Sequence, residues 1–212
     1  MNSIKLVTLS ILFILLSSCN EVVKFADPQP IGKKNISKFP SELWGRYKSL
    51  TGNETLEINA TSIVYGEQET AAIEKQESDS SLTIQLNNNR HRLSITLNND
   101  SVHGIYIKED TIFNIKKGNC LRFLKGNYFL NTHLSDGSYE VRMITPGKHS
   151  SITLSSIEPD EIENLKAVTQ AEEPETLNDS ISYLYRPTKK EFKKFVTEMH
   201  GFRNKTTFIK IE

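Results

Sequence analysis

Short runs of alternating apolar and polar residues fill the sequence from Leu43 to about Phe123, and clusters of Asn, Asp and Gly separate them. The two clearest runs carry apolar residues at Leu82, Ile84 and Leu86 and at Leu93, Ile95 and Leu97. Alternation with a period of two is typical of strands with one buried face, and the intervening residue types favour turns. The connections are too short for helical crossovers, so consecutive strands should pair as antiparallel neighbours. We therefore predict a mainly β chain built on an antiparallel meander, as a sandwich or a partly open barrel.

The alternation ends after Leu154, and the rest of the chain predicts two short helices. Pro159 and the acidic residues behind it favour the first turn of a helix that reaches Leu165. Thr188 and Glu191 form a capping box at the start of the second helix. Its apolar stripe is Phe192, Phe195, Val196 and Met199, and Gly201 is expected at its C-terminal cap. The stripe needs a sheet to pack on, which predicts a smaller α+β part with strands at 181–185 and 206–211.

A short motif recurs in the two halves of the chain. Leu43-x-Gly45-x-Tyr47 is repeated as Leu124-x-Gly126-x-Tyr128, so the two glycines stand 81 positions apart (126 − 45). Such a recurrence indicates two related β units. We therefore predict an antiparallel β domain at residues 39–123 and a C-terminal α+β domain at residues 124–212, interpreted as a divergent repeat of the β unit.

The N-terminus has the layout of a signal peptide, with one cation at Lys5 followed by a mostly apolar run from Leu6 to Leu16. That run is too short to span a bilayer comfortably. It ends in Leu16-Ser17-Ser18-Cys19, which resembles the lipobox of bacterial lipoproteins. The alternative interpretation is an ordinary secretory signal that happens to contain a cysteine.

The resemblance implies that residues 1–18 are a signal peptide and that Cys19 becomes a lipidated N-terminus, with acyl chains such as palmitate. The expected location is the bacterial cell envelope. In the lipoproteins that this motif resembles, an aspartate directly after the lipidated cysteine can signal retention in the inner membrane. Asn20 stands in that place here, so the resemblance implies the outer membrane, facing the periplasm. Residues 19–38 are poor in apolar side chains and include Asp27-Pro28-Gln29-Pro30, which predicts a lipidated tether between membrane and fold.

The composition and residue spacing of the sequence do not point to a nucleic-acid, metal or catalytic site. Charges balance at 26 Lys plus Arg against 26 Asp plus Glu, so no overall field favours nucleic acid. No metal-ligand spacing or catalytic fingerprint occurs among the five histidines, which are His91, His103, His133, His149 and His200. Cys120 is interpreted as a small buried hydrophobe. We therefore expect no metal, no cofactor and no catalytic residue.

One cluster has the residue types of a nucleophilic triad, namely His133, Ser135 and Asp136. Members of a triad converge from separate elements, which near neighbours in a turn cannot do. Asp136-Gly137 instead favours a solvent-exposed hairpin turn.

These observations favour a membrane-anchored lipoprotein acting as a non-catalytic binding or structural module, with an envelope protein or a small apolar ligand as partner. One alternative is a lipocalin-like carrier, because Gly45-Arg46-Tyr47 resembles the glycine, one residue and tryptophan that open the first lipocalin strand. In a carrier, Trp44, Tyr47 and Tyr128 would face the ligand. The other alternative is a small periplasmic hydrolase using dispersed residues such as His103 or His133.

The binding interpretations differ in what they require of the interior. A carrier should enclose an apolar cavity beneath Trp44 and Tyr47. A protein-binding module should fill that space and expose a contiguous apolar patch instead.

Overall fold

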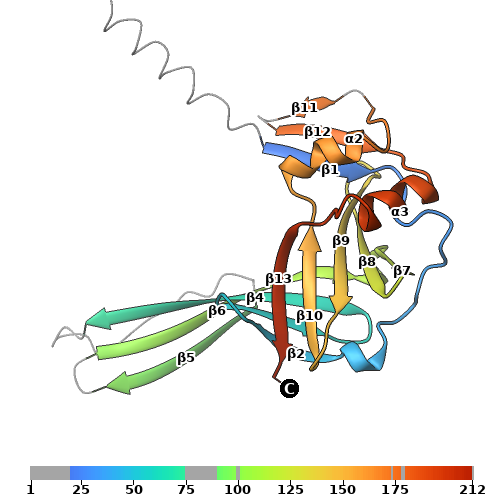
Figure 1. The fold of residues 1–212 in the computed structure, drawn as a ribbon. Coiled ribbons are helices and arrows are strands. Elements are labelled where there is room, and N and C mark those ends of the chain that lie inside the picture. The colour runs from blue at the N-terminus through green and yellow to red at the C-terminus, as the bar shows by residue number, and fades with distance from the viewer. Residues whose placement is uncertain (1–19, 75–89, 99–100, 173, 178–179, 212) are drawn as a thin grey trace, which may run out of the picture.

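The computed structural model describes residues 20–74, 90–98, 101–172, 174–177 and 180–211, so the predicted signal peptide and Cys19 lie outside it (Figure 1). The strands are β1 (Asn20–Phe25), β2 (Gly45–Ser49), β3 (Glu54–Ile58), β4 (Ser62–Glu74), β5 (Arg90–Asn98), β6 (Ser101–Asn114), β7 (Cys120–Leu124), β8 (Asn127–His133), β9 (Tyr139–Pro146), β10 (Ser151–Ser156), β11 (Glu175–Leu177), β12 (Ser180–Tyr185) and β13 (Asn204–Lys210). The helices are α2 (Ile162–Lys166) and α3 (Lys189–Thr197), with 3₁₀ turns at Ser41–Leu43, Ile115–Lys117 and Pro159–Glu161. The predicted mainly β fold with two short helices is confirmed.

All thirteen described strands belong to one mixed sheet. Its main path runs β11-β12-β1-β9-β10-β13-β2-β3-β4-β6-β5, and β8 with β7 branches from β9. Strands β2, β3 and β4 pair in sequence as antiparallel neighbours, which confirms the predicted meander. Among the described pairs, β1 with β12 is the parallel one, and its register covers all six residues of β1.

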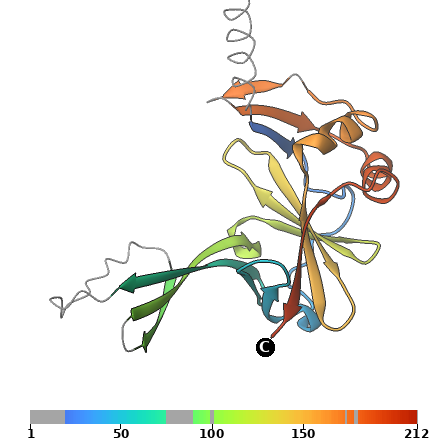
Figure 2. The same cartoon turned by 60° about the vertical axis from the view of Figure 1, so that its left-hand side comes forward.

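Strands β4, β6 and β5 continue beyond the body as an arm (Figure 1). Figure 2 shows from a second angle that this arm leaves the body at the end away from β1. β5 contains the run Leu93, Ile95 and Leu97 and pairs with β6. That preceding run, Leu82 to Leu86, lies outside the described residues.

Two hydrophobic clusters share strands β8 and β9. Leu130 and Ile144 belong to the first cluster, with Tyr47, Leu56 and Phe113 from the N-terminal half. The neighbours Phe129 and Met143 belong to the second cluster, on the opposite face, because successive residues of a strand alternate. Residues 39–123 and 124–212 therefore share a core.

The predicted domain boundary and repeat describe this fold poorly. The boundary at 123–124 falls just before the turn of the β7–β8 hairpin. Gly126 lies in that turn with φ +85°, whereas Gly45 is the first residue of β2. The two glycines occupy unlike places, so their matching sequence motifs do not mark a structural repeat.

Helix α3 begins as predicted, with Thr188 and Glu191 making both hydrogen bonds of the capping box. Phe192 and Phe195 are fully buried in the second cluster, which also contains Tyr185 of β12 but not the residues of β13.

Gly201 has a different role from the predicted cap. His200 takes the left-handed backbone (φ 52°), while a Cβ on Gly201 would lie 2.4 Å from the Phe195 ring. The glycine therefore allows the chain to pass close to the helix.

Residues 20–38 are folded onto the body instead of forming the predicted tether. β1 pairs along its whole length with β12, and Phe25 is fully buried. The following loop is held by Asn131, whose side chain bonds both the N–H and the C=O of Gln29. Arg122 donates to the carbonyls of Pro28 and Pro30. Polar contacts hold this segment, so its low apolar content was a poor guide to its structure.

Candidate functional site

The end of the body where β1 begins is the first candidate site, because β1 directly follows Cys19, the predicted lipidation position. Asn20 is already paired with Ser180 of β12, and Ser180 pairs in turn with Leu177 of β11. Strands β11, β12 and β1 together form one end of the molecule, with α2 beside them (Figure 1). We call this region the β1 end.

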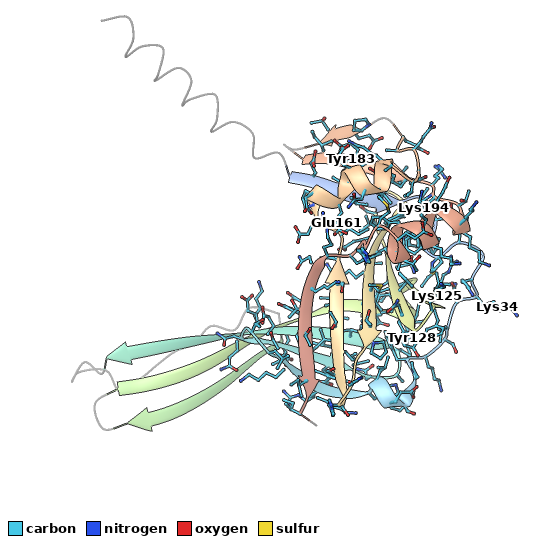
Figure 3. The ribbon with its side chains drawn as sticks, in the orientation of Figure 1. Lys34, Lys125, Tyr128, Glu161, Tyr183 and Lys194 are labelled. Atoms are coloured by element: carbon cyan, nitrogen blue, oxygen red, sulfur yellow. The ribbon has the colours of Figure 1, made fainter. Side chains whose placement is uncertain are left out.

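An open polar groove lies next to the β1 end. It has a volume of about 640 Å³ and runs between the C-terminus of α2 and the start of α3, lined by Lys166, Thr169, Glu172, Arg186 and Glu191 among others. A neighbouring hollow of about 580 Å³ shares Lys166 and Glu172 and adds Tyr183 and Pro174. Figure 3 shows Tyr183 on the strands above Glu161, well separated from Tyr128.

The charged groups of the groove have partners in the groove or next to it. Lys166 donates to Glu163 (Nζ to Oε1, 2.8 Å) and lies 4.9 Å from the centre of the Tyr183 ring. The Tyr183 hydroxyl donates to Glu21 (3.2 Å), and Arg186 donates to Glu172 (2.5 Å). The hydrogen bond to Glu163 raises the pKa of Lys166, which favours its charged form. The groove therefore offers compensated ion pairs and an aromatic ring, and its lysine is poorly suited to act as a nucleophile or base.

A smaller pocket of about 140 Å³ lies on the opposite face of β1 and β12, lined by Lys24, Asp136, Ser138 and Ser182 among others. Asp136 accepts a hydrogen bond from Lys24 (2.8 Å) and two from Ser138. These bonds hold the pKa of the Asp136 carboxyl far below its usual range. The ion pair links the β8–β9 turn to β1.

The predicted hairpin turn at Asp136-Gly137 is present: the Leu134 N–H donates to the Ser138 carbonyl, and the Gly137 N–H donates to the Leu134 carbonyl. His133 packs edge-on against the ring of Tyr139, with 5.2 Å between centroids. Ser138, rather than a histidine, bonds the Asp136 carboxylate. The side chain of His103, the other residue named for a hydrolase, lies outside the described part of the chain.

The acidic residues at 160–163 serve the local structure. Glu161 is fully buried, and its Oε2 accepts from the N–H groups of Glu158 and Arg203. Asp160 pairs with the Arg203 guanidinium at 2.7 Å. Within the described residues, no group of three or more His, Cys, Asp or Glu side chains could hold a metal ion.

The three aromatic residues predicted to face a ligand differ in their surroundings, although Tyr128 packs against the same cluster that contains Tyr47. Tyr47 is 1% exposed in the first cluster, and its hydroxyl donates to the Leu43 carbonyl. Trp44 is 39% exposed and donates its indole N–H to the Phe39 carbonyl. Tyr128 packs on the Phe123 ring, at 4.9 Å between centroids. Tyr47 thus fills the interior, while Trp44 lies on the surface.

Three exposed apolar side chains, Leu50, Ile209 and Ile211, occur where β13 meets β2, and we call them the apolar patch. Their exposed fractions are 58%, 41% and 54%. Ile209 and Ile211 lie on one face of the strand because they are two residues apart, and the Leu50 N–H bonds the Thr207 carbonyl of the same strand. The sequence did carry a signal for it, since Ile209 and Ile211 alternate with Phe208 and Lys210, so that apolar residues occur on both faces of this strand.

Cys120 was interpreted as a small buried hydrophobe, but it is only half-buried, and its Sγ accepts a weak hydrogen bond from Asn35 Nδ2 (3.5 Å). No described helix is long and apolar enough to cross a membrane.

The chain has no significant match among family models, curated proteins or solved structures.

Proposed function

We propose that the protein is a bacterial cell-envelope lipoprotein, lipidated at Cys19 and acting as a non-catalytic binding module. The observation that carries the anchor is the lipobox-like Leu16-Ser17-Ser18-Cys19, which ends one residue before the first strand. A membrane anchor placed there joins the fold directly and leaves β1 and its pairing with β12 intact.

Two features support binding of a protein over carriage of a small apolar ligand. Tyr47 occupies the interior where a carrier would need a cavity. The patch Leu50, Ile209 and Ile211 exposes aliphatic side chains on the outer face of the sheet. Exposed apolar groups that lie together are typical of interaction surfaces.

The anchor is tested by replacing Cys19 with Ser and following both palmitate incorporation and membrane fractionation. We expect the variant to lose the label and to leave the membrane fraction or accumulate as precursor. Cys120→Ser is the matched control, because it removes the other cysteine and should change neither property. A Cys19→Ser protein that stays membrane-bound through a high-salt wash would contradict the lipid anchor.

Binding is tested by placing a photo-crosslinking residue in the intact cell at Ile209 or Ile211. We expect a discrete crosslinked product from the patch, and none from Lys193, which is exposed on α3. Normal lipidation with no product from either isoleucine would contradict binding at this patch.

A further inference from the structure

We infer that the β1 end lies directly against the lipid headgroups, so that the membrane surface is itself a contact partner of the folded body. This inference rests on lipidation of Cys19 and adds to it the orientation of the protein. The predicted tether would have allowed the body to move tens of ångströms away from the bilayer.

Chain length is the main argument. Asn20 is paired with Ser180, so no unpaired residue separates the anchored cysteine from the sheet. An extended chain spans at most about 3.6 Å per residue, so Phe25, six positions after Cys19, can lie at most about 22 Å from it. Phe25 is fully buried in the second cluster, so that core is held within this short distance of the anchor.

Unpairing β1 would be needed to lengthen the connection, and the structure opposes it. All six residues of β1 pair with β12, and Phe25 contacts the rings of Phe192 and Tyr185. Beyond β1, Asn131 fixes Gln29 by two hydrogen bonds. Peeling the segment away would break the pairing and expose a buried aromatic ring.

Among the described residues near the β1 end, the cations Lys24, Lys166 and Arg186 are each paired with a carboxylate, so they give little net attraction to anionic lipid. Lys166 is paired with Glu163, and Glu21 lies beside it on Tyr183. Lys24 is paired with Asp136. The contact should therefore be imposed by the short covalent connection and be insensitive to salt and to lipid charge.

The test uses the full lipidated protein, purified with a Cys120→Ser background and reconstituted into phosphatidylcholine vesicles containing a lipid with a spin-labelled headgroup. A fluorophore is attached at Val22→Cys, in β1 and 38% exposed, or at Ile211→Cys, at the C-terminal end of the chain. Figures 1 and 2 show the C-terminus at the opposite end of the body from β1. We expect at least threefold stronger quenching at position 22 than at position 211.

Glu163→Cys on α2 gives a second position near the β1 end, with a side chain 79% exposed, should labelling at Val22 disturb β1. Its quenching should also exceed that at position 211. Inserting a twelve-residue Gly/Ser spacer after Cys19, with a mean reach of about 20 Å, should reduce the quenching at position 22 to the level at position 211.

Each outcome below supports or overturns the proposed orientation. Mass analysis of Cys19 shows whether the lipid is present, and so distinguishes failure of the orientation from failure of the anchor. Equal quenching at positions 22 and 211 in protein with an intact lipid would overturn the orientation and leave the anchor standing. Quenching at position 22 that appears only with anionic lipid and is lost in high salt would also overturn it, because charge would then be the cause. An unmodified Cys19 would overturn both proposals together.

Discussion

Tyr185 and Tyr47 are both buried, and their hydroxyl groups differ in hydrogen bonding. The Tyr47 hydroxyl donates to Leu43, whereas none of the described residues pairs with the hydroxyl of Tyr185. A buried polar group without a partner costs about 1 to 3 kcal/mol, and a satisfied one contributes about 1 kcal/mol. We predict that Tyr185→Phe raises the free energy of unfolding by about 1 kcal/mol and that Tyr47→Phe lowers it by about the same amount. Urea denaturation of both variants measures this, and a loss of stability in Tyr185→Phe would show that its hydroxyl is bonded.

Burial raises the pKa of Tyr185 to about 12, from an ordinary value of 10. The unfolded chain then loses its tyrosine proton at a lower pH than the folded chain. The free energy of unfolding should therefore fall between pH 10 and pH 12 because of this residue. Tyr185→Phe should fall less steeply over the same range, as measured by urea denaturation at pH 9 and pH 11.

Asp136 should also make the free energy of unfolding depend on pH, but at acid pH and with stability lost as the pH falls. Its carboxyl pKa is lowered by hydrogen bonds from Lys24 and Ser138. This group therefore stabilises the fold above the unfolded-state pKa near 3.9, and the contribution is lost as the pH falls toward the lower, folded-state value. The side chain is 47% exposed, so screening limits the contribution. We predict that Asp136→Asn costs about 1 kcal/mol at pH 7 and less at pH 3. A deficit that grows on acidification would contradict this sign.

At the scale of elements, helix α3 is fixed by local sequence and is the clearest success of the sequence analysis. Its capping box and its spacing of phenylalanines are encoded within twelve residues, so no distant partner was needed to recognise it. Phe195 is fully buried, and truncating a buried phenylalanine to alanine costs about 3 to 5 kcal/mol. We predict that loss for Phe195→Ala in chemical denaturation. Lys194→Ala, on the exposed face shown in Figure 3, should change stability by less than about 0.5 kcal/mol.

Strand β1 could not be recognised in the same way. Its loop is held by Asn131, 102 positions from Gln29, and composition near residues 20–38 contains no trace of that contact. Asn131 is fully buried and also donates to the carbonyls of Cys120 and Phe129. The groove at Lys166 could not be predicted from the sequence either. The residues around Lys166 come from β1, α2 and β12, which are far apart in the sequence and meet only in the fold.

The segment of residues 26–38, which we call the strap, should be held to the body mainly by Asn131, and two substitutions test this. Asn131→Ala removes the partners of Gln29 and leaves buried backbone groups unpaired, which should cost about 3 kcal/mol. Asn35→Ala, which removes an exposed partner of Arg122, should cost less than about 1 kcal/mol. Chemical denaturation of both variants measures the loss of stability, and limited proteolysis measures how readily the strap is cleaved. Equal losses would mean that Asn131 does not hold the segment.

For the whole molecule, the sequence predicted the β class and the helices but not how the halves combine. Alternation within a strand shows that one face is buried, and it does not show against which strand. Phe129 and Leu130 are adjacent and serve different clusters, so the shared strand β8 looked like the entry to a second domain. The predicted ligand-facing residues Tyr47 and Trp44 differ in burial for a similar reason, since Tyr47 is buried and Trp44 is exposed despite their closeness in sequence.

The lipid anchor at Cys19 is the central proposal, and both the function and the orientation of the body depend on it. The most direct measurement is the mass of the N-terminal peptide from the mature protein, purified from membranes of the native host. We predict a peptide that begins at Cys19 and carries the added mass of its acyl chains, with no peptide from residues 1–18. A mature chain that begins at another residue, or that carries an unmodified Cys19, would contradict the account.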